Sequence, residues 1–103
     1  MKAVMIILNQ AHYDQIVNDL SRLNIRGFTS LKEVYGRGSK TGNPHYGNHA
    51  WPTVNNAIFT VVEDERVRPL LERLKALDRE YDNLGLRAFV WNCHVNKNSF
   101  IKY

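Results

Sequence analysis

The amino-acid sequence predicts a single α+β domain built from four strands and two helices. Strand-length apolar runs, two segments with apolar residues at helical spacing, and their alternation in the order βαββαβ all indicate this class. With 103 residues, 44% of them hydrophobic, the chain can bury one core but is too short for two domains.

The first two predicted elements are a buried strand and an amphipathic helix. Residues 3–8 form a continuous apolar run, ended by polar Asn9 and Gln10, which is typical of a strand covered on both faces. A helical period follows, and Asn24 and Gly27 stand where the helix should stop. Its apolar positions are Tyr13, Ile16, Val17, Leu20 and Leu23.

The second and third predicted strands flank a long polar loop. Residues 28–35 read FTSLKEVY, which is rich in β-branched and aromatic residues, and Gly36 closes the run. Residues 54–62 read VNNAIFTVV, and the apolar second half of this run predicts a central strand.

The second helix has the clearest pattern in the chain. Asp64 is expected to cap it, with acidic Glu63 and Glu65 beside the cap. Because Pro69 falls near the first turn, we expect the regular helix to begin slightly after Asp64. The apolar stripe consists of Val67, Leu70, Leu71, Leu74, Leu77 and Tyr81.

Residues 86–95 alternate along the last predicted strand and complete the fold. The element order suits the split βαβ, or ferredoxin-like, arrangement: a four-stranded antiparallel sheet with both helices on one face. Residues 1–95 would form this domain and residues 96–103 a tail. Since two helices cover only one face of the sheet, a partner subunit is expected to cover the other.

Composition limits the classes of partner. The net charge of +4 favours anionic partners, yet the 14 Lys and Arg residues form no basic block and the RNA-recognition signature is incomplete, so we expect no nucleic acid. Cys93 is the single cysteine, which suits a reducing compartment. No apolar run reaches the roughly 18 residues of a membrane helix, so a cytoplasmic protein without direct membrane insertion is expected.

The long loop, residues 37–53, is the candidate functional segment, because connections of this length are uncommon in compact domains. Gly36 and Gly38 let backbone amides approach an anion, and Arg37 and Lys40 add positive charge. However, GRGSKTG matches neither a GxxxxGK[ST] loop nor a GxGxxG turn followed by a helix.

A metal site remains a second interpretation of the same loop. His45 and His49 could converge on copper or zinc if the loop folds back. Cys93 and His94 are unlikely to bind one ion together, because successive strand residues point to opposite faces. No hydroxyl or thiol has a base partner by spacing, so we expect no enzyme.

The order of elements and three segments resemble the PII signal-transduction superfamily. MKAVMIIL resembles its first strand, RGFTSLKEVYGRGSKTG resembles the start of its long T-loop, and AIFTVVEDERVRPLLERL resembles its third strand and second helix. The resemblance implies a homotrimer that binds effectors such as adenine nucleotides between subunits. It also implies a T-loop that contacts a target, either a membrane transporter or a regulatory enzyme.

Carried over to this chain, the resemblance assigns two groups of residues. Tyr46 and Trp51 would belong to the partner-contacting loop, with Tyr46 near its tip. The usual glycine-rich B-loop is replaced by DREYDNLGLR, so ordinary ATP binding is not expected. The ligand-binding group would be Gly36, Arg37, Gly38, Lys40, Gly85 and Arg87.

The function predicted on this basis is regulation, through sensing of a nucleotide or another small anion at intersubunit clefts. The alternative is a divalent-metal-binding trimer that is similar to the cation-tolerance family and uses His45 and His49.

Overall fold

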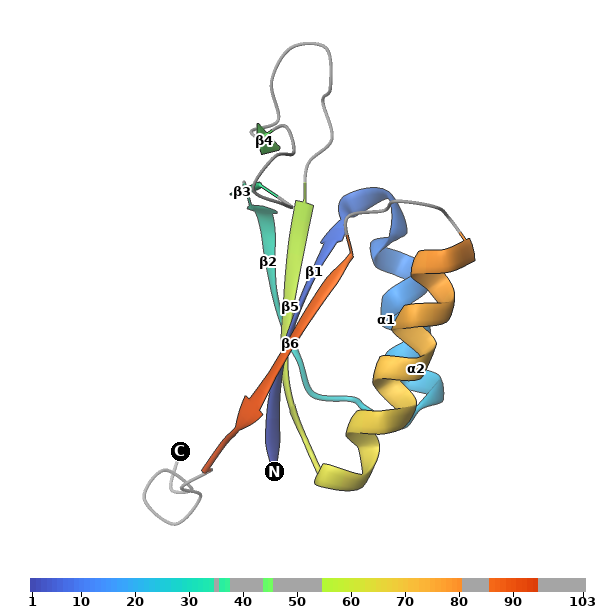
Figure 1. Ribbon diagram of the computed structural model, residues 1–103, viewed down its shortest axis with the longest axis vertical. Coiled ribbons are helices and arrows are strands. Elements are labelled where there is room, and N and C mark those ends of the chain that lie inside the picture. The colour runs from blue at the N-terminus through green and yellow to red at the C-terminus, as the bar shows by residue number, and fades with distance from the viewer. Residues whose placement is uncertain (35, 38–43, 46–54, 81–85, 95–103) are drawn as a thin grey trace.

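The computed structural model describes residues 1–34, 36–37, 44–45, 55–80 and 86–94. Four strands form one antiparallel sheet in the order β2-β5-β1-β6, and both helices lie on one side of it (Figure 1). This is the predicted ferredoxin-like α+β fold. The strands are β1 (Lys2–Asn9), β2 (Thr29–Val34), β5 (Asn55–Val62) and β6 (Arg87–Asn92), and the helices are α1 (Tyr13–Arg22) and α2 (Asp64–Glu80).

The core lies between the sheet and the two helices. Alternate residues of the central strand β1 point into it, and Val4, Ile6 and Leu8 are at most 1% exposed. Ile58 of β5 extends this layer on the neighbouring strand. The helices contribute Ile16, Leu20, Leu70, Leu74 and Leu77, so the two helical periods in the sequence correspond to the buried helix faces.

Polar contacts tie the two helices to each other. Arg73 Nε lies 2.9 Å from Asp19 Oδ2, and the Asp19 carboxylate is 6% exposed. Arg66 Nη1 donates to the Leu23 carbonyl at 2.7 Å. Because Leu23 follows α1 and Arg66 lies in the first turn of α2, the second bond holds the end of α1 against the start of α2, while the Asp19–Arg73 pair joins α1 to the middle of α2.

Several elements differ from the sequence predictions; β2, for example, begins at Thr29 rather than at Phe28. Helix α2 begins at Asp64 and runs without interruption through Pro69, so the expected delayed start was wrong. Strand β6 ends at Asn92, although the Cys93 amide still donates to the Met1 carbonyl at 3.2 Å. A short helix, η1 (Gln10–His12), precedes α1 and is capped by Asn9 Oδ1, which accepts from the Ala11 amide at 2.9 Å.

Candidate functional site

The candidate site lies at the end of the sheet to which the long loop is attached. The loop leaves β2 after Val34 and returns to β5 at Asn55, and these two residues face each other across the strands. Asn9 of β1 pairs with Asn55 from the other side. Arg87 begins β6 at the same end, paired with Ile7.

The base of the loop is a two-stranded ladder that the sequence did not predict. In β3 (Gly36–Arg37) and β4 (Pro44–His45), Gly36 pairs with His45 and Arg37 with Pro44. Two predicted ligand-binding residues and one predicted metal ligand therefore belong to one ladder next to the sheet. The other predicted loop residues lie outside the described part of the chain: Gly38, Lys40, Tyr46, His49 and Trp51.

Arg87 is exposed, and its Nη1 donates to the Leu86 carbonyl at 2.9 Å. The register places its side chain on the sheet face opposite the helices, because it pairs with Ile7 and alternates with the core-facing Ala88. Gly85, predicted beside it, lies outside the described residues.

The two halves of the predicted site do not lie together within one chain. The ladder containing Gly36 and Arg37 follows β2, and Arg87 begins β6, so they stand at opposite edges of the sheet. Neighbouring strands are roughly 4.8 Å apart, so three spacings separate the edges by about 14 Å. Within one chain, the Gly36–Arg37 half and the Arg87 half are therefore separated by the width of the sheet.

A β-bulge immediately before the loop was also missed by the sequence analysis. Leu31 pairs with Ala57 and Val34 with Asn55, so two residues of β2, Lys32 and Glu33, oppose the single residue Asn56 of β5. Glu33 has a φ of 57°, the left-handed region that side chains disfavour. The available signal was the spacing of Leu31 and Val34, which an unbulged strand would place on opposite faces.

The sheet face opposite the helices is apolar and open. Leu31, Phe89 and Trp91 are 51%, 55% and 46% exposed, although all three are large hydrophobic residues. The Trp91 ring lies 6.0 Å from the Phe59 ring, centroid to centroid, and half-buried Met5 lies in register with Phe59 and Phe89. Contiguous apolar surface of this kind marks an interaction site.

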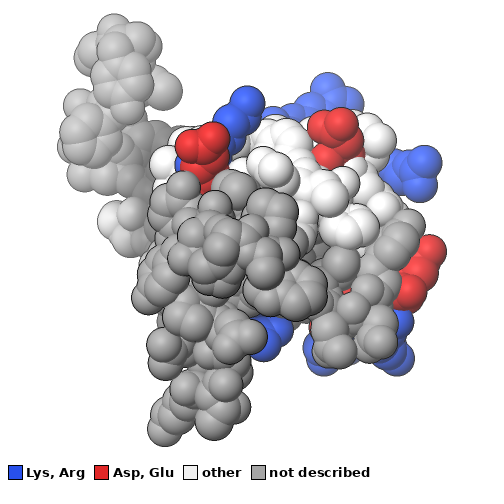
Figure 2. Space-filling model, turned by 90° about the horizontal axis from the view of Figure 1, so that it is seen from above, with Lys and Arg blue, Asp and Glu red and all other residues white. Residues whose placement is uncertain are grey.

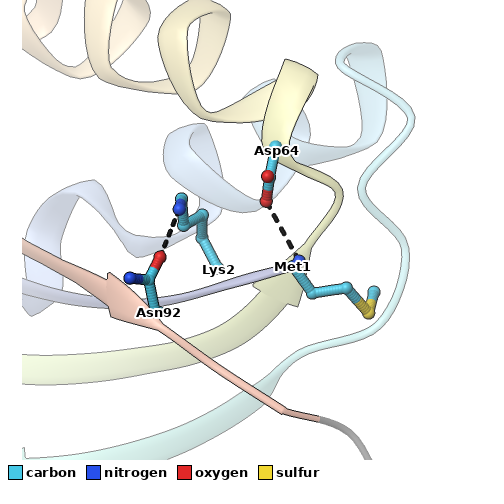
Figure 3. A network of polar contacts seen from close by, with 4 residues as sticks. All are labelled: Met1, Lys2, Asp64 and Asn92. Carbon is cyan, nitrogen blue, oxygen red and sulfur yellow. Dashed lines mark hydrogen bonds and ion pairs between the residues drawn. The ribbon is translucent and has the colours of Figure 1, made fainter.

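The other end of the sheet carries a polar network (Figure 3). The Met1 ammonium lies 3.0 Å from Asp64 Oδ1, and Lys2 Nζ donates to Asn92 Oδ1. The hydrogen bond from the ammonium, together with the positive charges of Lys2 and the ammonium, lowers the pKa of Asp64. The network joins β1, α2 and β6 far from the loop.

The charges on the described surface at the loop end of the molecule are mixed in sign. In the view onto the loop end of the molecule, Lys and Arg side chains lie around the rim of the described surface, with Asp and Glu side chains among them (Figure 2). Within the ranges that the structure describes, His, Cys, Asp and Glu form no metal-binding group of three, and no helix is long and apolar enough to span a membrane. The predicted His45 and His49 pair is not tested by this, since residues 46–54 are not described.

Two comparisons place the chain among known proteins. The family model "Nitrogen regulatory protein P-II" matches residues 1–99. The structure of CPII from Thiomonas intermedia K12 bound to ADP and bicarbonate is 26% identical, covers 95% of this chain and 90% of its own, and superposes with a TM-score of 0.76. CPII bound to ADP, AMP and acetate is also 26% identical, with coverages of 92% and 87% and a TM-score of 0.74.

A more distant structure shares the fold. The PII-like signalling protein TTHA0516 from Thermus thermophilus is 22% identical, with coverages of 95% and 90% and a TM-score of 0.65. No curated protein matches the chain significantly. The match of the family model over nearly the whole length is decisive, and the chain therefore belongs to the nitrogen regulatory protein P-II family.

Proposed function

We propose that this protein is a homotrimeric PII-like sensor that binds an adenine nucleotide between subunits and reports it to a target protein through residues 37–53. One observation carries the proposal. Gly36 and Arg37 follow one edge strand and Arg87 begins the other, so a ligand held by both groups would bridge two subunits.

The open sheet face supports the assembly. Leu31, Phe89 and Trp91 leave about half of their side-chain surface in water in the single chain. Burying apolar surface yields roughly 25 cal/mol per Å², so covering this face would stabilise an oligomer substantially. Three 12.0 kDa chains would have a mass of about 36 kDa.

The positively charged residues of the candidate site and the ligands of the CPII structures both indicate the class of ligand. Arg37, Lys40 and Arg87 would supply cations to phosphate oxygens, and Gly36, Gly38 and Gly85 would let the backbone approach. CPII has been solved with ADP together with AMP, bicarbonate or acetate. Because DREYDNLGLR replaces the glycine-rich B-loop, we propose ADP or AMP rather than ATP, with a small carboxylate-like anion as the second effector.

A complementation experiment tests whether the site is shared between subunits. Arg37→Glu and Arg87→Glu each place a carboxylate beside the nucleotide phosphates, so each variant alone should bind ADP at least tenfold more weakly by calorimetry. When the two variants are unfolded together and refolded as mixed trimers, some clefts combine an intact Arg37 from one subunit with an intact Arg87 from the next. Those clefts should recover the wild-type affinity at reduced stoichiometry.

The control is Arg68→Glu, which makes the same charge change on an exposed residue of α2 at the opposite end of the sheet. It should leave ADP binding within twofold of wild type. Loss of binding in both single variants without recovery in the mixture would place the site within one subunit, and unaffected binding in either would remove that arginine from it.

The same calorimetry decides the metal alternative. Zinc or copper binding that is lost in His45→Ala/His49→Ala and kept in Arg37→Glu would favour the metal-binding trimer. We assign Tyr46 and Trp51 to contact with the target, a transporter or regulatory enzyme in the cytoplasm. A target captured by wild type but not by Trp51→Ala would support that assignment.

A further inference from the structure

The order of apolar and charged residues in β2 explains why this strand contains a bulge. The segment Leu31–Lys32–Glu33–Val34 places two charged residues between two apolar ones. In a regular strand, residues three apart point to opposite faces, which would turn Val34 toward the helices. The extra residue restores Val34 to the open apolar face together with Leu31, since Val34 pairs with Asn55.

A buried side chain of the neighbouring strand stabilises the bulge. Asn56 is 5% exposed, and it lies on the core-facing side of β5 between Ile58 and the loop. Its Oδ1 accepts a hydrogen bond from the Glu33 amide at 3.4 Å, a long bond that nevertheless gives the displaced amide a partner. The residue held in the left-handed conformation is thus the one whose backbone Asn56 binds.

The hydrogen bond between Glu33 and Asn56 lies close to the start of the long loop. Glu33 lies three residues before Gly36, where the β3–β4 ladder begins. Loss of the bulge would shift every following residue by one position and reverse the faces of the strand. The position of the β3–β4 ladder next to the sheet therefore depends on the conformation of Glu33.

We propose that Asn56 is a positioning residue: through the Glu33 amide it keeps the bulge in place, and the bulge sets the position of the β3–β4 ladder from which the long loop extends. Asn56 acts on the ligand site only through the loop. The part of this inference that concerns ligand affinity rests on the proposed nucleotide-binding function, whereas the part that concerns loop orientation does not.

The test uses Asn56→Leu, which keeps the shape of the side chain and removes the acceptor. Loop orientation is read from acrylamide quenching of Trp51 in a Trp91→Phe background, where Trp51 is the single tryptophan. We expect the quenching constant to change at least twofold, amide exchange in the peptide containing Glu33 to accelerate at least tenfold, and ADP affinity to fall at least tenfold.

A second mutation that reverses the effect of Asn56→Leu would show that Asn56 positions the bulge rather than merely packing in the core. Glycine adopts the left-handed region readily, so Glu33→Gly should favour the bulge without help from Asn56. The double variant Asn56→Leu/Glu33→Gly should therefore return the Trp51 quenching and the ADP affinity to within twofold of the background protein. The control Thr60→Val removes the hydrogen bond to the Gly27 carbonyl on the same face of β5, and it should lower the melting temperature without changing Trp51 quenching.

The possible results separate the role of Asn56 from the proposed nucleotide-binding function. Unchanged Trp51 quenching in Asn56→Leu, or no recovery with glycine at position 33, would overturn the inference. If Asn56→Leu does not fold, Glu33→Val makes the same test from the exposed edge strand, because a β-branched residue disfavours the left-handed conformation at position 33, and it should change Trp51 quenching to a similar extent. If the wild type binds no ADP, the proposed function fails, while the quenching and exchange measurements still decide the role of Asn56.

Discussion

Asp64 illustrates what one charged side chain contributes at a junction of elements. Its carboxylate accepts from the Met1 ammonium, and that hydrogen bond, with the nearby positive charges, holds its pKa below the ordinary value. A group with a lowered pKa in the folded state stabilises the protein above its unfolded pKa and loses this effect as the pH falls through the folded value.

The first prediction follows from the direction of the Asp64 pKa shift. Asp64→Asn removes the charge, so it should lower the melting temperature at pH 7. Because the carboxylate of the wild type becomes protonated in acid, the difference between the two proteins should shrink as the pH is lowered from 5 to 2. Thermal unfolding at several pH values measures this, and a difference that stays constant across the range would contradict it.

The second prediction concerns the ion pair between the helices. Arg73→Met leaves the Asp19 carboxylate, which is 6% exposed, without its cation. The loss of one partner from a buried pair costs about 3–5 kcal/mol, and we expect about 2–3 kcal/mol here because the Arg73 side chain is 37% exposed.

The double variant Asp19→Leu/Arg73→Met is the matched control for this pair. It replaces both charges by apolar groups and should recover most of the loss in urea unfolding. Equal destabilisation of the single and double variants would mean that packing rather than charge accounts for the effect.

At the scale of elements, the sequence predicts the fold well because each core element has a strong period. The apolar run of β1 and the helical stripe of α2 correspond to buried surfaces, whereas the alternation in β6 places Phe89 and Trp91 on the open sheet face. The β3–β4 ladder escaped prediction because two-residue strands carry no period. The bulge at Glu33 escaped it because it depends on pairing with β5, which lies far along the chain.

Pro69 provides the third prediction. It lies inside α2, so the amide that would bond to the Glu65 carbonyl is missing and the ring crowds that carbonyl. Since Pro69 is exposed, its replacement by alanine removes little packing. Pro69→Ala should raise the free energy of unfolding by about 1–3 kcal/mol in urea titrations. A decrease would mean that the restriction proline places on the unfolded chain outweighs its cost in the helix.

At the scale of the whole molecule, sequence reasoning could name the residues of the candidate site but not their distribution. Gly36, Arg37 and Arg87 were assigned to one ligand, and only the strand order reveals that they stand at opposite sheet edges. The order β2-β5-β1-β6 results from non-local pairing, which no local pattern specifies. The resemblance to the PII superfamily already implied a site between subunits, and the strand order gives that expectation a physical reason.

The last prediction tests that assembly through Phe89. This side chain is 55% exposed in the single chain, so Phe89→Glu should cost little stability in an isolated subunit. In a trimer with the open sheet faces packed together, it would bury a carboxylate among apolar side chains at each interface, which is strongly unfavourable. Sedimentation should then show 12.0 kDa monomers, and circular dichroism should show that they keep the wild-type secondary structure. ADP binding should be lost because no cleft forms.

The control is Glu72→Gln, on the exposed side of α2, which should remain trimeric and bind ADP normally. A Phe89→Glu protein that stays trimeric would mean that the subunits associate through another surface.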